Sequence, residues 1–488
     1  MKERVSSAYS WKKWICILVG LFFMFGFRFI PPFAPLEEYG MNILGIFIGT
    51  IFLWLTVSTA WPSLLALIAL TLDPNFTYAS VLSKSWGNWI VPFIIFSAVC
   101  ADSLNRSGFL KRASVYFISR PIARKSPWHF VILFFTAALV IGCFMESMTL
   151  FIVLLAIAEE IFEAVGWKKG DRAAGMIVLG IMMATSIASA MTPIGHTFVV
   201  LGMSLIENDT GTVVNYFSYS AMGIVAGIIG FVLMILILKY IMKPDLSALK
   251  NLDIEKMQEK LPPVSKREVL SLSIFGIVVL LWFAPGILTF LWPAAAKWLS
   301  SLGTTVPAFI GIILLSLIKV DDQPLINIGD AMKRVPWMAV ILVATTQVIA
   351  SALTGADTHI TEWMANLITP IVGNFSGLGY VILVAVLAGF VTNFISSTVN
   401  TTLFYGIFIP LILTGTLAIG VNPVALACII GATSSLAFGA PSGRAHASLA
   451  AGTGWFTLKD MLLYGTGISV IISLIYAVVG YPIASLLM

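Results

Sequence analysis

Charged residues are scarce in this chain of 488 residues. Asp, Glu, Lys and Arg make up 10% of it and hydrophobic residues 59%, whereas about 25% of a soluble domain is charged. The surface of a soluble protein of this length cannot be built from 28 basic and 23 acidic side chains. The composition therefore excludes the set of soluble domains that the length alone would allow, and it predicts an all-α polytopic membrane protein.

Metal ligands and catalytic motifs are scarce as well. The four cysteines lie in apolar stretches without the paired spacing of metal ligands, and only four histidines are present. Neither a His-Glu-x-x-His nor a Gly-x-Ser-x-Gly motif occurs, so the sequence does not favour an enzyme. The net charge of +5 is expected to reflect membrane topology rather than nucleic-acid binding.

Apolar stretches that can span a membrane recur along the whole chain, since a helix needs about 20 apolar residues to cross a bilayer. The candidate spans run near residues 14–31, 41–57, 59–73, 88–104, 173–206, 216–242, 268–290, 296–318, 336–354, 423–454 and 461–486. Two further stretches, 127–163 and 375–414, are too long for one crossing and are interrupted by polar residues at 146–149 and 392–398. Such an interruption is typical of a hairpin that enters the membrane and returns on the same side.

The basic residues indicate an orientation. If both interrupted stretches are re-entrant, most of the 28 basic residues fall on one side of the membrane. The positive-inside rule places that side, and the N-terminus, in the cytoplasm. We therefore expect a multi-pass protein of the plasma (inner) membrane. The segments 105–125 and 357–371 are expected to lie along the membrane surfaces.

The chain also contains an internal repeat. A Ser-x-Thr tripeptide at 147–149 is followed by a Pro-x-Gly sequence at 193–195, and a second tripeptide at 396–398 is followed at nearly the same distance by Pro-x-Gly at 441–443. The predicted topology puts the first hairpin on the cytoplasmic side and the second on the outer side. The two halves are therefore expected to be inverted repeats, as in many secondary transporters.

The repeat predicts a binding site at its centre. Pro and Gly interrupt helices, so each Pro-x-Gly sequence is expected to break a span and to start a half-helix near the bilayer centre. Each hairpin tip starts a returning helix, with Ser or Thr expected at the capping position. Four helix N-termini, with free N–H groups and partial positive charge, would then meet in one place and bind an anion. Unpaired carbonyls at the breaks suit small cations beside it.

These tripeptides, breaks and interfacial segments resemble the divalent anion:sodium symporter family, the transporters of dicarboxylates, citrate and sulfate, over nearly the whole chain. The resemblance implies a homodimer and an inverted-repeat, elevator-type transporter with about 11 transmembrane helices and two re-entrant hairpins. The expected parts are residues 1–126, the first-repeat scaffold and interfacial helix; 127–242, the first-repeat transport elements; 243–267, a cytoplasmic loop; 268–371, the second-repeat scaffold and interfacial helix; and 372–488, the second-repeat transport elements.

The tips depart from the family pattern of Ser-Asn-Thr, because Met148 and Ser397 replace the two Asn residues. The resemblance implies that a second cation site keeps its oxygen ligands, which suit a hard cation. At the first site it leaves Ser147, with Cys143 and Met148 in positions of oxygen donors. The implied cation ligands are Ser147, Thr392, Ser396, Ser397 and the carbonyls of Ile395 and Gly439. The implied substrate contacts are Thr149, Thr192, Pro193, His196, Ser397, Thr398, Pro441 and Arg444.

Ionisable and amide side chains near the repeat each have two interpretations. Arg444 lies at mid-depth, where an arginine costs roughly 2.5–3.5 kcal/mol on insertion scales; it either clamps an oxyanion in bidentate fashion or forms a structural ion pair. His196, at the matching position, is either a ligand contact or a hydrogen-bonded core residue. Glu146 either pairs with one of these two or takes up a coupling proton. Asn393 and Asn400 either supply the lost amide contacts or cap and pack.

The sequence thus predicts a secondary active transporter of small organic anions. Di- or tricarboxylates are the expected cargo, with sulfonate or sulfate as further options. We expect sodium as the coupling ion, no organic cofactor and no other metal. A cation-independent anion exchanger and a proton-coupled symporter that uses Glu146 stay open as alternatives. An anion channel and an intramembrane enzyme are the other classes that the sequence leaves to experiment.

Overall fold

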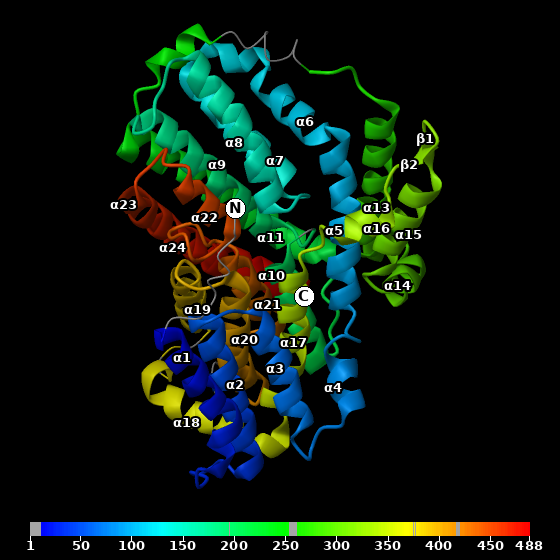
Figure 1. Ribbon diagram of the computed structural model, residues 1–488, viewed down its shortest axis with the longest axis vertical. Helices are drawn as coiled ribbons and strands as arrows, with labels where there is room; N and C mark the ends of the chain where they lie inside the picture. The colour runs from blue at the N-terminus through cyan, green and yellow to red at the C-terminus, as the bar shows by residue number, and fades with distance from the viewer. Residues whose placement is uncertain (1–10, 195, 253–260, 374, 376, 416–419) are drawn as a thin grey trace, which may run out of the picture. The chain divides into compact units, whose positions relative to one another are not determined.

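Helices form almost all of the regular structure (Figure 1). The computed structural model describes residues 11–194, 196–252, 261–373, 375, 377–415 and 420–488. Within them, β1 (Lys319–Val320) and β2 (Gln323–Pro324) form one short antiparallel hairpin, in which Lys319 pairs with Pro324. The predicted all-α class is confirmed.

Long apolar helices confirm the polytopic prediction. Six helices in the described part of the chain are long and apolar enough to cross a membrane, or seven if one bent pair counts as a span. The six are α2 (Glu38–Thr56), α5 (Ile90–Ser107), α9 (Arg172–Met191), α11 with its π-helical extension (Tyr216–Met242), α13 (Lys266–Leu291) and the continuous α23–α25 (Leu458–Leu487).

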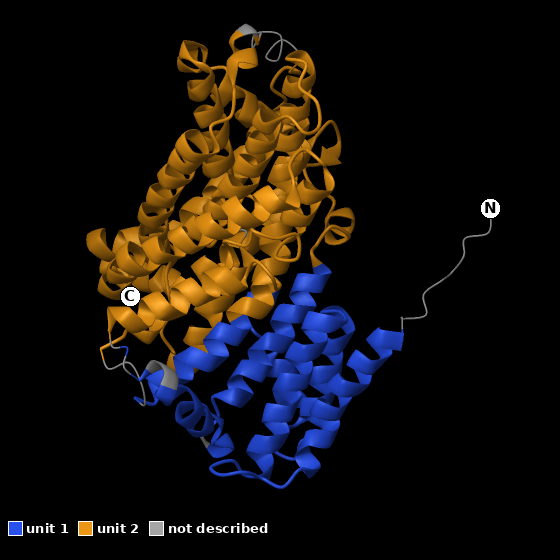
Figure 2. Ribbon diagram, turned by 90° about the vertical axis from the view of Figure 1, so that its left-hand side faces the viewer, with its two compact units in different colours: residues 1–91, 337–376, 402–419 blue, residues 92–336, 377–401, 420–488 orange. Residues whose placement is uncertain are grey.

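Internal contacts divide the chain into two compact units, drawn in separate colours in Figure 2. Unit 1 comprises residues 1–91, 337–376 and 402–419. Its helices besides α2 are α1 (Trp11–Leu21), α3 (Ala60–Thr71), α4 (Tyr78–Lys84), α17 (Trp337–Leu353), α18 (Ile360–Val372) and the later part of α20 (Ser397–Leu413). Ser63 joins three of them: its hydroxyl accepts from the Trp54 indole at 3.0 Å, and its carbonyl from Thr345 at 3.2 Å.

Unit 2 comprises residues 92–336, 377–401 and 420–488 and contains both predicted hairpin tips. Its further helices are α6 (Phe109–Ile118), α7 (Pro127–Gly142), α8 (Ser147–Ala164), α10 (Thr197–Thr210), α14 (Pro293–Ser301), α15 (Val306–Leu317), α16 (Ile328–Met332), α19 (Leu378–Val391), α21 (Pro423–Ser434) and α22 (Ala445–Gly452).

The core of unit 2 is built on α9 and α21. Every residue of α9 from Ala173 to Met191 is buried, and so is every residue of α21 from Val424 to Ser434. A helix that is apolar all round is stable only when it is covered on all sides. Close packing of α10 on α21 depends on Gly202, since a β-carbon there would lie 2.8 Å from the carbonyl oxygen of Ala427.

Both predicted helix breaks are present in the structure. The backbone is non-helical between α9 and α10 and again between α21 and α22. Thr192 takes extended angles, φ −137° and ψ 153°, as a residue before proline prefers. Gly195 of the first break lies outside the described residues.

Both interrupted stretches are pairs of helices, as predicted. α7 and α8 are joined through residues 143–146, and α19 and α20 through residues 392–396. The capping prediction was wrong for α8: its N-cap is Glu146, whose carboxylate accepts a hydrogen bond from the Thr149 amide at 2.9 Å. A carboxylate there is also stabilised by the positive end of the helix dipole.

One expected span differs from the structure. Residues 296–318 were expected to cross as one helix, but α14 and α15 meet at a bend of 73°. Gly303 lies between them with φ +80°, a left-handed conformation that ends a helix. Pro307 opens the next helix within its first turn.

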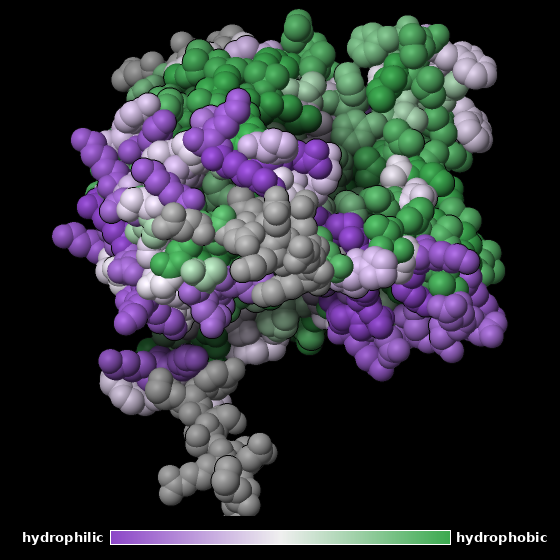
Figure 3. Space-filling view, turned by 90° about the horizontal axis from the view of Figure 1, so that it is seen from above, coloured by the Kyte–Doolittle hydropathy of each residue, from purple (hydrophilic) through white to green (hydrophobic). Residues whose placement is uncertain are grey.

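Hydrophilic side chains gather at the end of unit 2 that carries α6 and the α8–α9 loop (Figure 3). Exposed basic residues here include Lys111 of α6, Arg124 and Lys125 of the 3-10 turn Pro121–Lys125, and Lys168 and Lys169 of the α8–α9 loop. A surface of this kind is suited to water and lipid headgroups rather than to the hydrocarbon core. The interfacial position of residues 105–125 stays a prediction.

Candidate functional site

The first helix break is fastened to the first hairpin tip. The Thr192 hydroxyl donates a hydrogen bond to the carbonyl of Cys143. The imidazole Nε2 of His196, 2% exposed, lies 2.9 Å from the carbonyl oxygen of Gly142, so it must carry the donated proton. His196 thus makes the contacts of a hydrogen-bonded core residue.

Arg444, which precedes α22, has three hydrogen-bond partners. Its Nη1 donates to the Ser189 hydroxyl at 2.7 Å and to the Ser435 carbonyl at 3.0 Å, and its Nη2 donates to the Ser147 hydroxyl at 3.1 Å. The guanidinium carbon lies 4.7 Å from the ring centroid of Phe198, within cation–π range. Of the five N–H donors of an arginine, Nε–H and one on Nη2 have no acceptor among the described residues.

Asn393 holds the second tip to its surroundings. Its Nδ2 group donates to the Gly389 carbonyl at 2.8 Å and to the Ser469 hydroxyl at 3.2 Å, and its Oδ1 accepts from the Phe438 amide at 3.1 Å and the Gly439 amide at 2.6 Å. These are the contacts of a packing and capping residue, one of the two roles expected for Asn393. It also fixes the loop whose carbonyl is an expected cation ligand.

The expected ligands of the second cation site lie close together at this tip. The Thr392 hydroxyl is fully buried, and it lies 3.3 Å from the Ser397 hydroxyl and 2.7 Å from the Ser434 carbonyl. Asn400 contacts the same residue, Ser434, because its Nδ2 donates to the Ser434 hydroxyl at 2.8 Å. Its Oδ1 is buried and has no hydrogen-bond partner in the described structure.

A cavity of about 370 Å³ lies between these elements, and it is lined among others by Glu146, Phe198, Ser396, Ser397, Pro441 and Arg444. These residues belong to the starts of α8, α10, α20 and α22. The predicted convergence of four helix N-termini is therefore confirmed. Backbone N–H groups and helix dipoles of this kind favour an anion.

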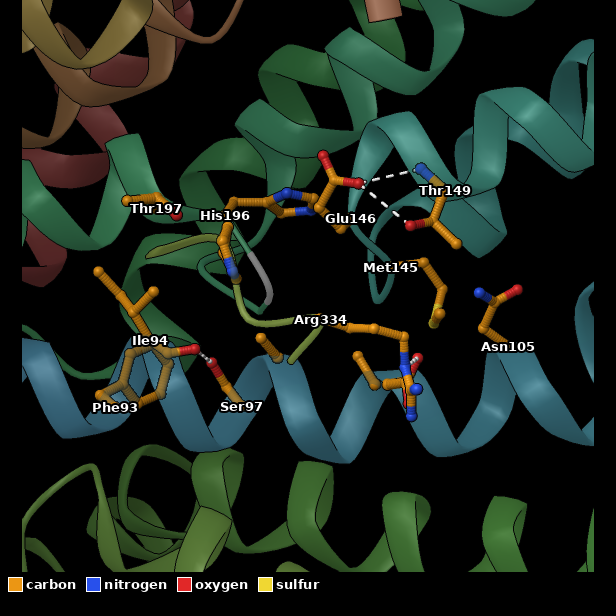
Figure 4. A pocket seen from close by; sticks show the side chains of 14 residues that line it. Phe93, Ile94, Ser97, Asn105, Met145, Glu146, Thr149, His196, Thr197 and Arg334 are labelled. Atoms are coloured by element: carbon orange, nitrogen blue, oxygen red, sulfur yellow. Dashed lines mark hydrogen bonds and ion pairs between the residues drawn. The ribbon is translucent and has the colours of Figure 1, made fainter. Parts of the chain in front are cut away.

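A second cavity, of about 260 Å³, is lined by residues of α5, of the first tip and of the start of α10 (Figure 4). Thr149 and His196 line this cavity and not the first one, whereas Glu146 lines both. An ion pair closes part of its wall, with Arg334 Nη2 2.7 Å and Nε 3.0 Å from Asp102 Oδ2. Thr192, Pro193 and Thr398, three further expected substrate contacts, are buried and line neither cavity.

Several residues of the site were not singled out from the sequence. Ser189, Ser435 and Phe198 all contact Arg444, and the Asp102–Arg334 pair was missed. Of these residues, only the pair gave a signal in the sequence, because Asp102 and Arg334 are opposite charges at the ends of two predicted spans, 88–104 and 336–354. The hydroxyl-rich end of α9 gave none, because serine is common in apolar helices as a donor to its own backbone.

Comparisons with known proteins identify the family. A model described as the sodium:sulfate symporter transmembrane region matches residues 11–488. The chain is 22% identical over 461 residues to a sodium-dependent dicarboxylate transporter SdcS of Staphylococcus saprophyticus, covering 91% of this chain and 86% of that one. It is 22% identical over 501 residues to the protein of the same name from Staphylococcus aureus, covering 99% and 93%.

A solved structure is similar in fold. The Alcanivorax borkumensis YdaH transporter, whose topology is described as unusual, superposes with a TM-score of 0.50 at 13% identity over 85% of this chain and 88% of that one. At this identity the likeness concerns the fold alone. Because the family model matches residues 11–488, the chain belongs to the sodium:sulfate symporter family, whose members are membrane transporters and not enzymes.

Proposed function

We propose that this protein is a secondary active transporter that carries a small dicarboxylate across the plasma membrane together with sodium. The observation that supports this most is the position of Arg444 in the cavity of about 370 Å³. Its two remaining donors can bind one carboxylate in bidentate fashion. The starts of four helices surround the same space and stabilise negative charge.

Sodium as the coupling ion is supported by the second tip. The Thr392 hydroxyl lies within hydrogen-bond distance of both the Ser397 hydroxyl and the Ser434 carbonyl, and a hard cation prefers such oxygen ligands. The two staphylococcal relatives are described as sodium-dependent dicarboxylate transporters. Tricarboxylates, sulfonates and sulfate are the other cargoes to be tested. An elevator motion and a homodimer are proposed from the family resemblance.

Uptake into proteoliposomes tests this proposal. Labelled succinate should accumulate when an inward sodium gradient is imposed and not when potassium replaces sodium. Uptake that ignores sodium but requires anion inside the vesicles would instead establish an exchanger. Competition by citrate, sulfonates and sulfate ranks the cargoes.

Thr392→Ala is expected to raise the half-saturating sodium concentration for uptake by about tenfold or more. An oxygen lost from a charged partner costs roughly 1.5–3 kcal/mol, and each 1.4 kcal/mol is tenfold. Thr50→Ala is the matched control, because Thr50 is also fully buried, and the only hydrogen bond of its hydroxyl within the described part of the chain goes to the Ile46 carbonyl of its own helix. An unchanged sodium dependence in Thr392→Ala would remove this residue from the cation site.

Glu146→Gln distinguishes sodium coupling from proton coupling. Glu146 is exposed to the cavity that holds Arg444, and its charge opposes an anion by on the order of 1 kcal/mol. Gln keeps an oxygen for the α8 cap, so sodium-driven uptake should persist and the KM for the anion should fall by about threefold to tenfold. Wild-type uptake driven by a pH gradient alone, and lost in Glu146→Gln, would establish the proton-coupled alternative.

A further inference from the structure

The two tips differ in how their oxygens are used. At the first tip, three acceptors already receive hydrogen bonds from side chains of the helix breaks. These acceptors are the carbonyls of Gly142 and Cys143 and the hydroxyl of Ser147, and their donors are His196, Thr192 and Arg444 in that order. An oxygen that accepts such a bond has less lone-pair density to offer a cation.

The second tip lacks a donor at the position that matches Thr192. By the internal repeat, Thr392 matches Cys143, and Ala440 matches Thr192. Ala440 has no hydroxyl, so nothing equivalent to the Thr192 bond can cover the carbonyl of Thr392. The side-chain hydroxyl of Thr392 adds an oxygen where the first tip has the sulfur of Cys143. In the second tip the Ser442 hydroxyl of the break donates to the Asn393 carbonyl at 3.3 Å, whereas no donor among the described residues covers the Thr392 carbonyl. The carbonyl of Thr392 therefore stays available to a cation.

At the first tip a positive charge is already part of the protein. The guanidinium of Arg444 is held by the Ser147 hydroxyl, the Ser189 hydroxyl and the Ser435 carbonyl, three oxygens from three elements. Oxygens converging from separate elements are what a bound sodium ion would require. The charge is costly at this depth, and these contacts offset the cost.

We infer that Arg444 takes the place of a coupling ion at the first tip, so that the transport cycle binds one sodium ion, at the second tip. This inference rests on the proposed sodium-coupled function. The guanidinium of Arg444 holds the first tip together and attracts the anion as a bound sodium ion would. Because it is covalently part of the protein, it is not released, and it adds no free energy from the sodium gradient to transport. Ser147 then serves to position Arg444 and is not a sodium ligand.

The ratio of sodium to anion tests the inference in wild-type proteoliposomes. At zero voltage and equal pH on both sides, a tenfold sodium gradient should balance a dicarboxylate gradient of about tenfold, whereas two sodium ions would balance about 100-fold. An inside-negative potential should slow uptake, because one sodium leaves a dianion with net negative charge. A ratio of two would overturn the inference while leaving sodium coupling intact.

A pair of matched variants separates the two tips. Ser147→Ala should raise the anion KM by about tenfold and leave the half-saturating sodium concentration within twofold of wild type, whereas Thr392→Ala should raise the sodium value. Sodium-dependent thermal stability of the purified proteins gives the same comparison without transport, with Ser147→Ala responding as wild type does. If Ser147→Ala weakens the sodium response as much as Thr392→Ala, Ser147 is a sodium ligand and the inference is wrong. If wild type shows no sodium response in either assay, the proposed function itself is wrong.

Discussion

Arg444→Ala is expected to abolish high-affinity uptake, with a loss of at least about 100-fold in kcat/KM for the anion. Two hydrogen bonds from a charged donor are worth roughly 1.5–3 kcal/mol each, and each 1.4 kcal/mol is tenfold. The variant also removes the three bonds that join the first tip, α9 and the second break. Uptake of labelled dicarboxylate, together with ligand-induced thermal stabilisation, measures both effects.

Arg444→Lys is the informative partner of that variant. Lysine keeps the positive charge but has no planar fork, so it cannot hold three protein oxygens and a carboxylate together. We expect it to recover part of the affinity lost in Arg444→Ala. Transport at normal affinity in the alanine variant would show that Arg444 is purely structural. If Arg444→Ala no longer elutes as a single species in size-exclusion chromatography, Arg444→Lys is compared with wild type instead.

Asn393→Ala is expected to lower the free energy of unfolding by roughly 3–5 kcal/mol, because it leaves several buried partners unsatisfied. The side chain is fully buried. It donates hydrogen bonds to Gly389 and Ser469 and accepts hydrogen bonds from the amides of Phe438 and Gly439. Thermal denaturation in detergent, with and without sodium, measures the change. Sodium should stabilise the variant less than wild type, because the carbonyl of Gly439 loses its anchor.

Asn400→Ala is the matched control for Asn393→Ala. Asn400 is equally buried in the same tip, but among the described residues it donates only to the Ala388 carbonyl and the Ser434 hydroxyl, and its Oδ1 has no partner there. We expect a smaller loss of about 1–2 kcal/mol. Equal destabilisation by the two substitutions would contradict the special role of Asn393.

Much of the architecture was predictable because polar residues and prolines are conspicuous in apolar stretches. The hairpin tips and the breaks at Pro193 and Pro441 follow from that contrast, as does the meeting of four helix starts. The bend between α14 and α15 was missed, although residues 300–307 combine Gly303 and Pro307 with four Ser and Thr residues, a pattern that favours a helix break.

The partners of the charged groups could not be predicted. Ser189 lies 255 positions from Arg444, and Asp102 lies 232 positions from Arg334. Helical periodicity shows which face of one helix is buried, but it carries no signal about which distant helix supplies the donor or acceptor. The sequence therefore indicated the cavity region, Arg444 and Ser147, but not the Ser189 hydroxyl and the Ser435 carbonyl that also hold the guanidinium.

The place of Glu146 in the walls of both cavities has a consequence for timing. Exposed side chains change rotamer in picoseconds to nanoseconds, whereas collective movements of helices take microseconds to milliseconds. Because Glu146 lines both cavities, its carboxylate can change orientation far faster than the protein can change its overall conformation. The carboxylate can therefore respond to the contents of either cavity many times within each turnover.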